Sequence, residues 1–360
     1  MNSEINFAPV YRVLSDAISA RAFPGCAFGV LANRKVVLQG ALGRFTYDED
    51  ASAVSPQTVF DVASITKIMA TTAATMILHQ RGLLDLETPL GDLLPGFMVG
   101  RTSGDNARNV RLRHLLAHSS GLPGYVEFFR TIATAPALYR ALLELPLEAA
   151  PGERAEYSDP GFMLLGKAVE VLTRENLATW VQREVFAPLR MAATGFCPPL
   201  AARPLIPPTE EDACLRKRCI QGEVQDENAW LLNGIAGHAG LFSNVPDLLR
   251  FSAEILATSS VAELARLFDA ATVAHFAQRQ GPEGSSRALG WDTPSGNSSS
   301  GQHFSSRSIG HLGFSGCSLW IDLEANVAVA LLTNRTWPDR QCQLIRQVRP
   351  AFHDAVRESL

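Results

Sequence analysis

Runs of apolar residues typical of strands lie near the two ends of the chain, whereas apolar positions at helical spacing fill the middle. We expect strands over 25–32, 35–42, 318–322 and 327–333. We expect helices over 7–21, 67–81, 110–117, 138–145, 162–172, 178–185, 247–256 and 341–357. Strands at both ends with helices between them predict an α/β sheet domain into which a helical domain is inserted. The sheet domain is expected to comprise 1–62 and 230–360, and the helical domain 63–229.

Composition narrows the classes of partner. The 360 residues are 46% hydrophobic with a formal net charge of −4, which gives no electrostatic reason to expect nucleic acid or an anionic membrane as a partner. No apolar run approaches the roughly 18 residues of a membrane-spanning helix. Residues 1–10 lack the pattern of a secretory signal, so we expect a cytoplasmic protein. The six cysteines include no C-x-x-C pair, which favours reduced thiols over a zinc site or disulfides.

The stretch from Asp61 to Lys67 holds a serine and a lysine three residues apart, at the start of the helix expected over 67–81. Residues three apart lie on one face of a helix, so the Ser64 hydroxyl and the Lys67 amine can meet. A serine is a weak nucleophile until a neighbouring base takes its proton, and a deprotonated lysine is such a base. Burial and the positive end of the helix dipole both favour the neutral amine. The alternative is a helix-capping serine beside a solvated lysine.

A second serine competes with Ser64 for this role. The stretch 117–121, Ala-His-Ser-Ser-Gly, is similar to the nucleophile elbow G-x-S-x-G, but the strand that must precede such an elbow is missing. His114 and His118 are four residues apart without the glutamate of an H-E-x-x-H motif, so we expect packing or capping roles for them. Ser64, not Ser119, is therefore the predicted nucleophile.

A third stretch can complete a proton-transfer system around Ser64. Tyr157 follows a Pro-Gly-Glu turn at 151–153, and a phenol beside a lysine can relay a proton between nucleophile and leaving group. Asp159 can hold that phenol or the lysine by a hydrogen bond. The alternatives are a half-buried aromatic side chain for Tyr157 and a helix cap for Asp159.

A glycine-rich stretch, 310–316, leads into the strand expected over 318–322. Its glycines let a substrate lie close against the backbone, so we expect Gly313 and Ser315 to contact substrate. The alternative is a glycine-rich hairpin that binds nothing.

The same stretch offers groups that act on the reaction itself. The backbone N–H groups of Ser64 and Phe314 can form an oxyanion hole. His311 is expected to face the same cleft as an electrostatic or proton-shuttling group, with a surface histidine as the alternative.

Taken together, these elements resemble the serine β-lactamase and penicillin-binding-protein family, in particular its class C-like branch of β-lactamases, DD-peptidases and esterases. The motifs that carry the resemblance are Ser64-Ile65-Thr66-Lys67 for S-x-x-K, Tyr157-Ser158-Asp159 for Y-x-N and His311-Leu312-Gly313 for K-T-G or H-x-G. The resemblance covers nearly the whole chain. It implies a two-domain α/β (α+β) fold with an antiparallel sheet flanked by the amino- and carboxyl-terminal helices, an inserted all-helical domain, and a cleft between the two. It implies no metal or organic cofactor.

Two positions depart from the family pattern. Asp159 stands where the lactamases and DD-peptidases usually have asparagine, and its charge repels an anionic substrate but can stabilise a protonated lysine. His311-Leu312 replaces the lysine and threonine that grip the carboxylate of a penicillin or a D-alanyl peptide, so that anchor is weakened. Both changes point away from an efficient β-lactamase.

The segments 222–229 and 234–243 resemble a particular subgroup of the family, which includes amidases that remove peptides from muramic acid. Gln225 stands where a histidine of that subgroup is expected. His238 is expected to border the cleft and contact substrate, with a turn histidine as the alternative.

The predicted function is hydrolysis of an amide or ester through an acyl-enzyme, with Ser64 as nucleophile, Lys67 as base and Tyr157 as proton relay. The subgroup resemblance favours a peptide derived from peptidoglycan. The alternatives are a carboxylesterase for small acyl esters, a true β-lactamase or DD-peptidase, and a non-catalytic ligand-binding module. The expected partner is a small molecule or short peptide, with no nucleic acid and no membrane, and no oligomeric state is predicted.

Overall fold

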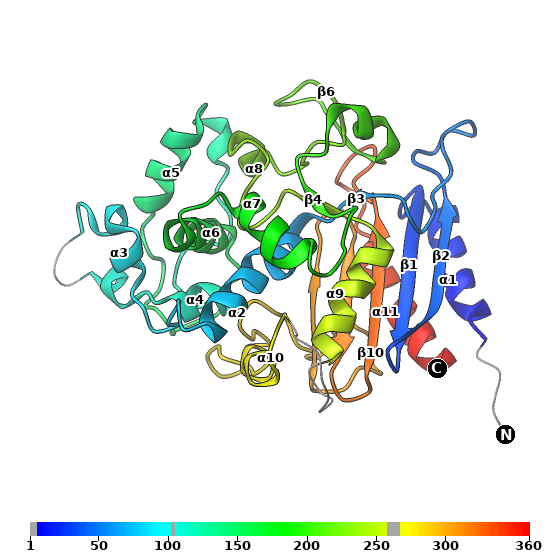
Figure 1. Cartoon of the computed structure of the whole chain (residues 1–360). Coiled ribbons are helices and arrows are strands. Elements are labelled where there is room, and N and C mark those ends of the chain that lie inside the picture. Colours follow the sequence, from blue (N-terminus) through cyan, green and yellow to red (C-terminus); the bar gives the residue numbers. More distant parts are fainter. Residues whose placement is uncertain (1–5, 102–104, 258–266) are drawn as a thin grey trace.

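Strands from the two ends of the chain meet in one sheet, and helices occupy the space beside it (Figure 1). The computed structural model describes residues 6–101, 105–257 and 267–360. The strands are β1 (Gly25–Ala32), β2 (Lys35–Gly43), β3 (Phe60–Asp61), β4 (Gly195–Phe196), β5 (Pro208–Asp212), β6 (Arg218–Gln221), β7 (Leu241–Ser243), β8 (Ser308–Leu312), β9 (Ser318–Asp322) and β10 (Val327–Thr333). The helices are α1 (Ala8–Ser19), α2 (Ala73–Gln80), α3 (Leu90–Leu93), α4 (Leu112–Leu116), α5 (Ala135–Leu143), α6 (Asp159–Thr173), α7 (Leu177–Val181), α8 (Glu227–Leu231), α9 (Val245–Ala257), α10 (Ala270–Phe276) and α11 (Ile345–Ser359).

The main sheet is antiparallel, with the strand order β2-β1-β10-β9-β8. Asn33 and Arg34 form the β1–β2 turn with φ of 49° and 65°, the left-handed conformation that a two-residue turn between twisted strands requires. At the opposite edge, β8 pairs with β9 so that His311 lies beside Leu319. The edge strand β8 thereby carries the glycine-rich stretch to the cleft.

Helices cover both faces of this sheet. On one face, α1 and α11 pack side by side although they come from opposite ends of the chain. They bury Leu14, Phe28 and Phe352 in a shared core. On the other face, α9 lies against β1 and β10. Gly29 of β1 permits this approach, because a Cβ there would lie 2.5 Å from Val245 Cγ1.

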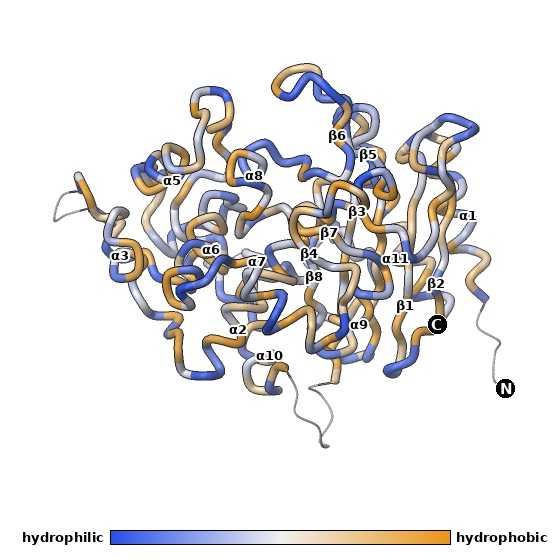
Figure 2. Tube along the Cα trace, turned by 45° about the horizontal axis from the view of Figure 1, so that its top comes forward, coloured by the Kyte–Doolittle hydropathy of each residue, from blue (hydrophilic) through white to orange (hydrophobic). Residues whose placement is uncertain are grey.

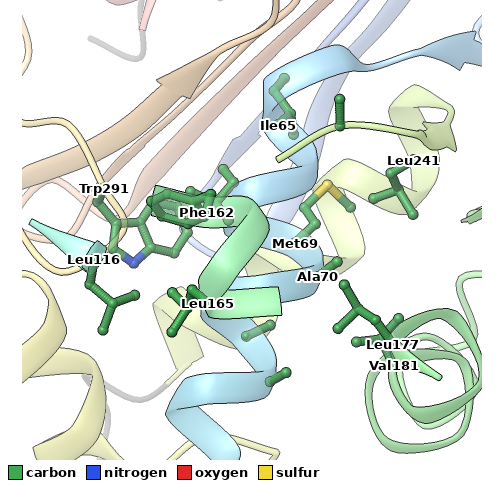
Figure 3. Close-up of a cluster of buried hydrophobic side chains, with 14 of the residues drawn as sticks. Ile65, Met69, Ala70, Leu116, Phe162, Leu165, Leu177, Val181, Leu241 and Trp291 are labelled. Carbon is green, nitrogen blue, oxygen red and sulfur yellow. The ribbon is translucent and has the colours of Figure 1, made fainter. Parts of the chain in front are cut away.

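Helices from the middle of the chain pack around α6 in a second apolar core, which continues onto the face of the sheet that α9 covers. Figure 3 shows Phe162 and Leu165 of α6 within a cluster of buried side chains that includes Met69. In Figure 2, hydrophilic and hydrophobic positions alternate along α5, an amphipathic helix that buries Leu138 and Leu142. The antiparallel sheet with its terminal helices and the helices packed around α6 confirm the predicted fold class, whereas the two domain boundaries stay a prediction.

The helix expected over 67–81 is not one element. Ser64 lies in a 3₁₀ turn, Ala63–Ile65, which is followed by a π-helical segment, Lys67–Thr72, and only then by α2. A π-helical turn is longer than an α-helical turn, but six residues are too few for the apolar pattern to distinguish a π-helix from an α-helix. The hairpin β5–β6 and the helices α8 and α10 were not predicted either.

Candidate active site

The turn that presents Ser64 is held in place by a buried carboxylate. Ala63 has a φ of 47°, a left-handed conformation that costs free energy in a residue with a side chain. Asp61 secures it: one carboxylate oxygen accepts from the Ala63 N–H at 2.8 Å, and the other accepts from the Gln225 N–H at 2.8 Å. Burial raises the pKa of Asp61 to about 6, although both N–H groups act to lower it. The nucleophile candidate thus sits on a fixed turn.

Lys67 is fully buried directly behind Ser64. Its Nζ donates to Ser64 Oγ at 3.0 Å, to Asp159 Oδ1 at 2.6 Å and to the His238 carbonyl oxygen at 3.0 Å. These three acceptors use all three donors of an ammonium group. The spacing of serine and lysine therefore brings the two side chains together as predicted.

The charge on this lysine differs from the expectation. Burial by itself lowers the pKa of Lys67, but the adjacent Asp159 carboxylate and the Tyr157 phenol outweigh it, and the net direction is upward from 10.5. A 2.6 Å contact with a carboxylate stabilises the ammonium form. The expectation that burial and the helix dipole would leave a neutral amine is therefore wrong, and the departure at Asp159 is the reason.

Tyr157 is fixed by His118, which holds the backbone on both sides of it. The His118 carbonyl oxygen accepts from the Glu156 N–H at 2.8 Å, and His118 Nδ1 accepts from the Ser158 N–H at 2.9 Å. The imidazole also packs on the phenol, with ring centroids 4.5 Å apart. The packing role expected for His118 is therefore a contact with Tyr157, and its two hydrogen bonds hold the residues on either side of that tyrosine.

The Tyr157 hydroxyl keeps its proton at neutral pH. Burial raises the pKa of Tyr157, and this outweighs the opposing effects of the Lys67 charge and of hydrogen bonds to Lys67 and Ser64. Lys67 Nζ lies 4.9 Å from the centre of the ring. The phenol, the amine and the serine are thus one contiguous group.

His311 reaches the cavity from the edge strand β8, and its ring centroid is 5.8 Å from that of Tyr157. Burial lowers its pKa well below 6.5, and the charges of Lys67 and Arg287 act in the same direction. His311 is therefore neutral, with Nδ1–H donating to the Leu312 carbonyl oxygen at 2.7 Å and Nε2 left as an acceptor. A neutral ring can shuttle a proton but supplies no fixed positive charge.

The turn after β8 lies against the Ser64 turn. A Cβ at Gly313 would lie 2.5 Å from the Val62 carbonyl oxygen, so only glycine allows this approach. The Phe314 carbonyl oxygen accepts from Arg335 Nε at 2.8 Å. The Phe314 N–H has no acceptor in the described part of the chain, as the proposed role in an oxyanion hole requires.

A cavity of about 720 Å³ opens in front of these groups. The predicted site residues that line it are Ser64, Tyr157, Asp159, His311, Gly313 and Phe314. The described residues contain no group of three or more His, Cys, Asp or Glu side chains placed to hold a metal ion. Within the described ranges, no helix has both the length and the apolar character needed to cross a membrane.

Comparison with known proteins shows the family of this chain. The family model described as Beta-lactamase matches residues 11–351. The chain belongs to the beta-lactamase family. It is 32% identical over 349 residues to N-acetylmuramyl-L-alanine amidase of Bacillus subtilis (strain 168), covering 88% of this chain and 78% of the amidase. It is 31% identical over 346 residues to a Salmonella typhimurium protein named as a D-alanyl-D-alanine carboxypeptidase, covering 87% of this chain and 79% of the relative.

The fold of this beta-lactamase-family protein also matches solved structures. EstCE1, a hydrolase with promiscuous acyltransferase activity, superposes with a TM-score of 0.76 at 22% identity, covering 97% of each chain. The family assignment and these relatives identify the protein as a hydrolase of the beta-lactamase serine-hydrolase type.

Two residues that were expected to contact substrate lie outside the cavity of this beta-lactamase-family protein. Ser315 is fully buried, and its Oγ donates to the Asp61 carbonyl oxygen at 2.8 Å. His238 is 1% exposed, its Nε2 is 2.9 Å from Asp226 Oδ1, and its carbonyl oxygen holds Lys67. Both predictions are corrected: Ser315 supports the Ser64 turn, and His238 supports the amine.

Gln225 borders the cavity without being free to act on a substrate. Its Nε2 donates to Glu210 Oε2 at 3.0 Å, and Arg340 Nε in turn donates to Glu210 Oε1 at 2.7 Å. Its side chain is therefore part of a polar network in the wall. Arg287, which the sequence did not single out, also lines the cavity.

Proposed function

We propose that the protein hydrolyses an amide bond of a peptide derived from peptidoglycan, through an acyl-enzyme at Ser64. The observation that carries the proposal is the contact of Ser64 Oγ with Lys67 Nζ at 3.0 Å at the edge of an open cavity. The similarity to a muramyl amidase and to a protein named as a D-alanyl-D-alanine carboxypeptidase supports the substrate class.

In the proposed acylation, Ser64 Oγ attacks the carbonyl carbon and its proton passes to Lys67. Because Lys67 and Asp159 are only 2.6 Å apart, the pair can shift one proton toward the carboxylate as the amine accepts another, so neither buried charge is left alone. The developing oxyanion accepts hydrogen bonds from the N–H groups of Ser64 and Phe314.

Collapse of the tetrahedral intermediate breaks the bond to the leaving amine. Tyr157 donates its proton to that nitrogen, because burial keeps the phenol protonated. Lys67 then returns a proton to Tyr157. Deacylation reverses these transfers. Tyr157 first passes its proton back to Lys67, with the Asp159 carboxylate taking up one proton from the amine, and the phenolate or the neutral His311 then accepts a proton from the attacking water, whose oxygen bonds to the acyl carbon. The bond from that carbon to Ser64 Oγ breaks as Lys67 returns a proton to the serine oxygen.

A carboxylesterase is the second candidate, since the same groups cleave esters and a neutral His311 provides no lysine-type charge for an anionic substrate. A panel of a muramyl peptide, an acyl-D-alanyl-D-alanine peptide, p-nitrophenyl esters and nitrocefin tests both candidates. We expect amide cleavage of a peptide substrate, with an acyl adduct on Ser64 in intact-mass spectra. Turnover of esters alone would favour the esterase, efficient turnover of nitrocefin a lactamase, and the absence of any adduct would refute the acyl-enzyme.

A further inference from the structure

Arg349 of α11 holds the turn 313–317, which joins β8 to β9. Its guanidinium donates to three carbonyl oxygens of this turn, those of Gly313 at 2.6 Å, Gly316 at 3.1 Å and Cys317 at 2.9 Å. The Gly313 oxygen also accepts from the Gly316 N–H at 3.0 Å, which closes a tight turn. One side chain from the last helix therefore determines the direction of several peptide groups at the wall of the cavity.

The bond to Gly313 also orients the N–H group of Phe314. The Gly313 carbonyl and the Phe314 N–H belong to one peptide unit, which is planar and trans, so the two groups point in opposite directions. Because Arg349 binds the Gly313 oxygen, the Phe314 N–H faces away from the guanidinium, and no described residue accepts from it. The N–H group expected to bind the oxyanion is thus aimed, through its own peptide unit, by a residue of α11.

Arg349 is also a buried cation without a carboxylate beside it. It is 7% exposed, and within the described ranges it forms no ion pair with an Asp or Glu side chain. Burial lowers the pKa of Arg349 to about 10, which leaves the guanidinium charged at neutral pH. A buried charge costs free energy, and proteins usually pair it with an opposite charge. Its only compensation here comes from carbonyl dipoles.

Arg101 shows the more usual arrangement. This arginine likewise donates to three carbonyl oxygens, those of Phe97, Leu143 and Leu145. Its side chain is 9% exposed, but the Asp105 carboxylate lies 3.6 Å from its Nη1. A role in holding backbone carbonyls therefore does not by itself require an unpaired charge.

The missing negative charge forms during the proposed acylation. Attack of Ser64 on a carbonyl carbon gives a tetrahedral intermediate whose oxygen is negative and lies at the Phe314 N–H. A cation bonded to the carbonyl end of a peptide unit polarises that unit and strengthens its N–H as a donor. Charges and dipoles that are fixed before the reaction stabilise a charge that develops only in the transition state.

We propose that Arg349 is a positioning residue of the oxyanion hole, which orients and polarises the Phe314 N–H through the Gly313 carbonyl and favours the negative tetrahedral oxygen by its unpaired charge. This inference rests on the proposed acyl-enzyme function. Arg349 also lines the cavity, but this role needs no contact with the substrate. It acts on a charge that the bound substrate does not yet carry, so its loss should change kcat and not KM.

The test compares a p-nitrophenyl ester with the thionoester that has sulfur in place of the carbonyl oxygen. Sulfur is the weaker hydrogen-bond acceptor, so the ester-to-thionoester ratio of kcat/KM reports on the oxyanion hole. We expect Arg349→Met to lower this ratio about 10- to 100-fold through kcat, less than the loss of a whole oxyanion-hole donor. Arg349→Lys, which keeps the charge, should restore part of it.

An arylboronic acid gives a second readout, because it forms a negatively charged tetrahedral adduct with a catalytic serine. Its inhibition constant should rise in Arg349→Met by a similar factor. Arg101→Met is the matched control, since it removes a buried arginine with three carbonyl bonds that does not line the cavity. It should leave both readouts unchanged, whatever its effect on stability.

The outcomes separate this inference from the function on which it rests. An unchanged ratio in a folded Arg349→Met variant overturns the inference, as does an equal fall in Arg101→Met. A raised KM with an unchanged kcat also overturns it, because Arg349 would then bind the substrate. If the parent protein forms no adduct on Ser64 with any substrate, the acyl-enzyme proposal itself fails. If Arg349→Met does not fold, the neutral Arg349→Gln variant is judged by the same ratio.

Discussion

Two turns of this protein place a serine directly after a residue with a left-handed backbone. Ala63 precedes Ser64 with a φ of 47°, and His118 precedes Ser119 with a φ of 55°. Both turns therefore store backbone strain of the kind often found at functional sites. Their surroundings differ: Ser64 lines the cavity, whereas Ser119 is 2% exposed.

The difference lies in what each turn contacts. The Ser64 turn meets an amine that can exchange a proton, while the main chain of Ser119 is bonded to the His114 carbonyl oxygen and the Gly152 N–H. The strained residue of the second turn, His118, holds the backbone on both sides of Tyr157. In the proposed function, one turn presents the nucleophile and the other positions its proton donor, so neither strain nor a serine motif suffices to identify the nucleophile.

The largest expected effect is the loss of activity in Ser64→Ala, with Ser119→Ala as the comparison. Ser64→Ala should lose about 10⁴-fold or more in turnover and all labelling by a fluorophosphonate, because no other group can carry the acyl chain. Ser119→Ala should keep substantial activity. Peptide mapping of the labelled parent protein checks the assignment, and an adduct on Ser119 would reverse it.

Asp159→Asn tests the charge of the amine at the Ser64 turn. Asp159 raises the pKa of Lys67, so its removal should let the neutral amine persist to lower pH. We expect the acidic limb of the kcat/KM profile to move down by about 1–3 pH units, the effect of an opposite charge at this distance. Glu170→Gln, which removes the partner of the more exposed Lys167, is the control and should leave the profile in place.

The same pair predicts a pH dependence of folding stability. The pKa of Lys67 is raised in the folded protein above the ordinary value of 10.5. Its stabilisation is therefore fully present below pH 10.5 and is lost as the pH rises through the folded value. Chemical denaturation of parent and Asp159→Asn should show a difference in unfolding free energy that shrinks in strongly alkaline buffer, and a constant difference would contradict the ion pair.

His118→Leu tests whether the second turn positions Tyr157. It leaves the buried Ser158 N–H without an acceptor, which costs about 1–3 kcal/mol of unfolding free energy, and it should lower kcat more than it raises KM. His114→Leu is a matched control, because His114 Nδ1 accepts from the Arg111 N–H at 3.1 Å away from the cavity. Equal losses of kcat in the two variants would remove the positioning role.

Ser315→Ala should have the smallest effect. The lost hydrogen bond to the Asp61 carbonyl oxygen is worth about 1 kcal/mol, measurable by thermal unfolding. KM should not change, since the hydroxyl does not reach the cavity. A raised KM with unchanged stability would return Ser315 to the substrate-contacting role first expected for it.

Local patterns predicted the parts of the site that depend on short spacings. The meeting of Ser64 and Lys67 follows from helix-like geometry over three residues, and the strands near both termini followed from apolar runs. The strand that carries His311 was harder to predict, because 308–312 is short and glycine-containing.

The contacts that were missed act across long separations. The His118 imidazole bonds to the backbone 40 residues further on, and Arg287 Cζ lies 5.2 Å from the centroid of the Tyr157 ring, next to the pairing of Asp292 with Gly310 of β8. Neither contact can be inferred from the local sequence. The charge of Lys67 was misjudged for a similar reason: local burial was weighed, whereas a carboxylate 92 residues away decides it.

Lys67 also ties the order of folding to activity. Its three acceptors belong to the Ser64 turn, to α6 and to the segment before β7, so the buried amine has no complete set of partners until all three have docked. Closing such long loops costs entropy that only late tertiary contacts repay. During refolding, helical circular dichroism should therefore recover first, and the capacity to be acylated should return in a later phase. Acylation of Ser64 would therefore report that folding is complete, because a partly folded chain has the serine but not the positioned Lys67.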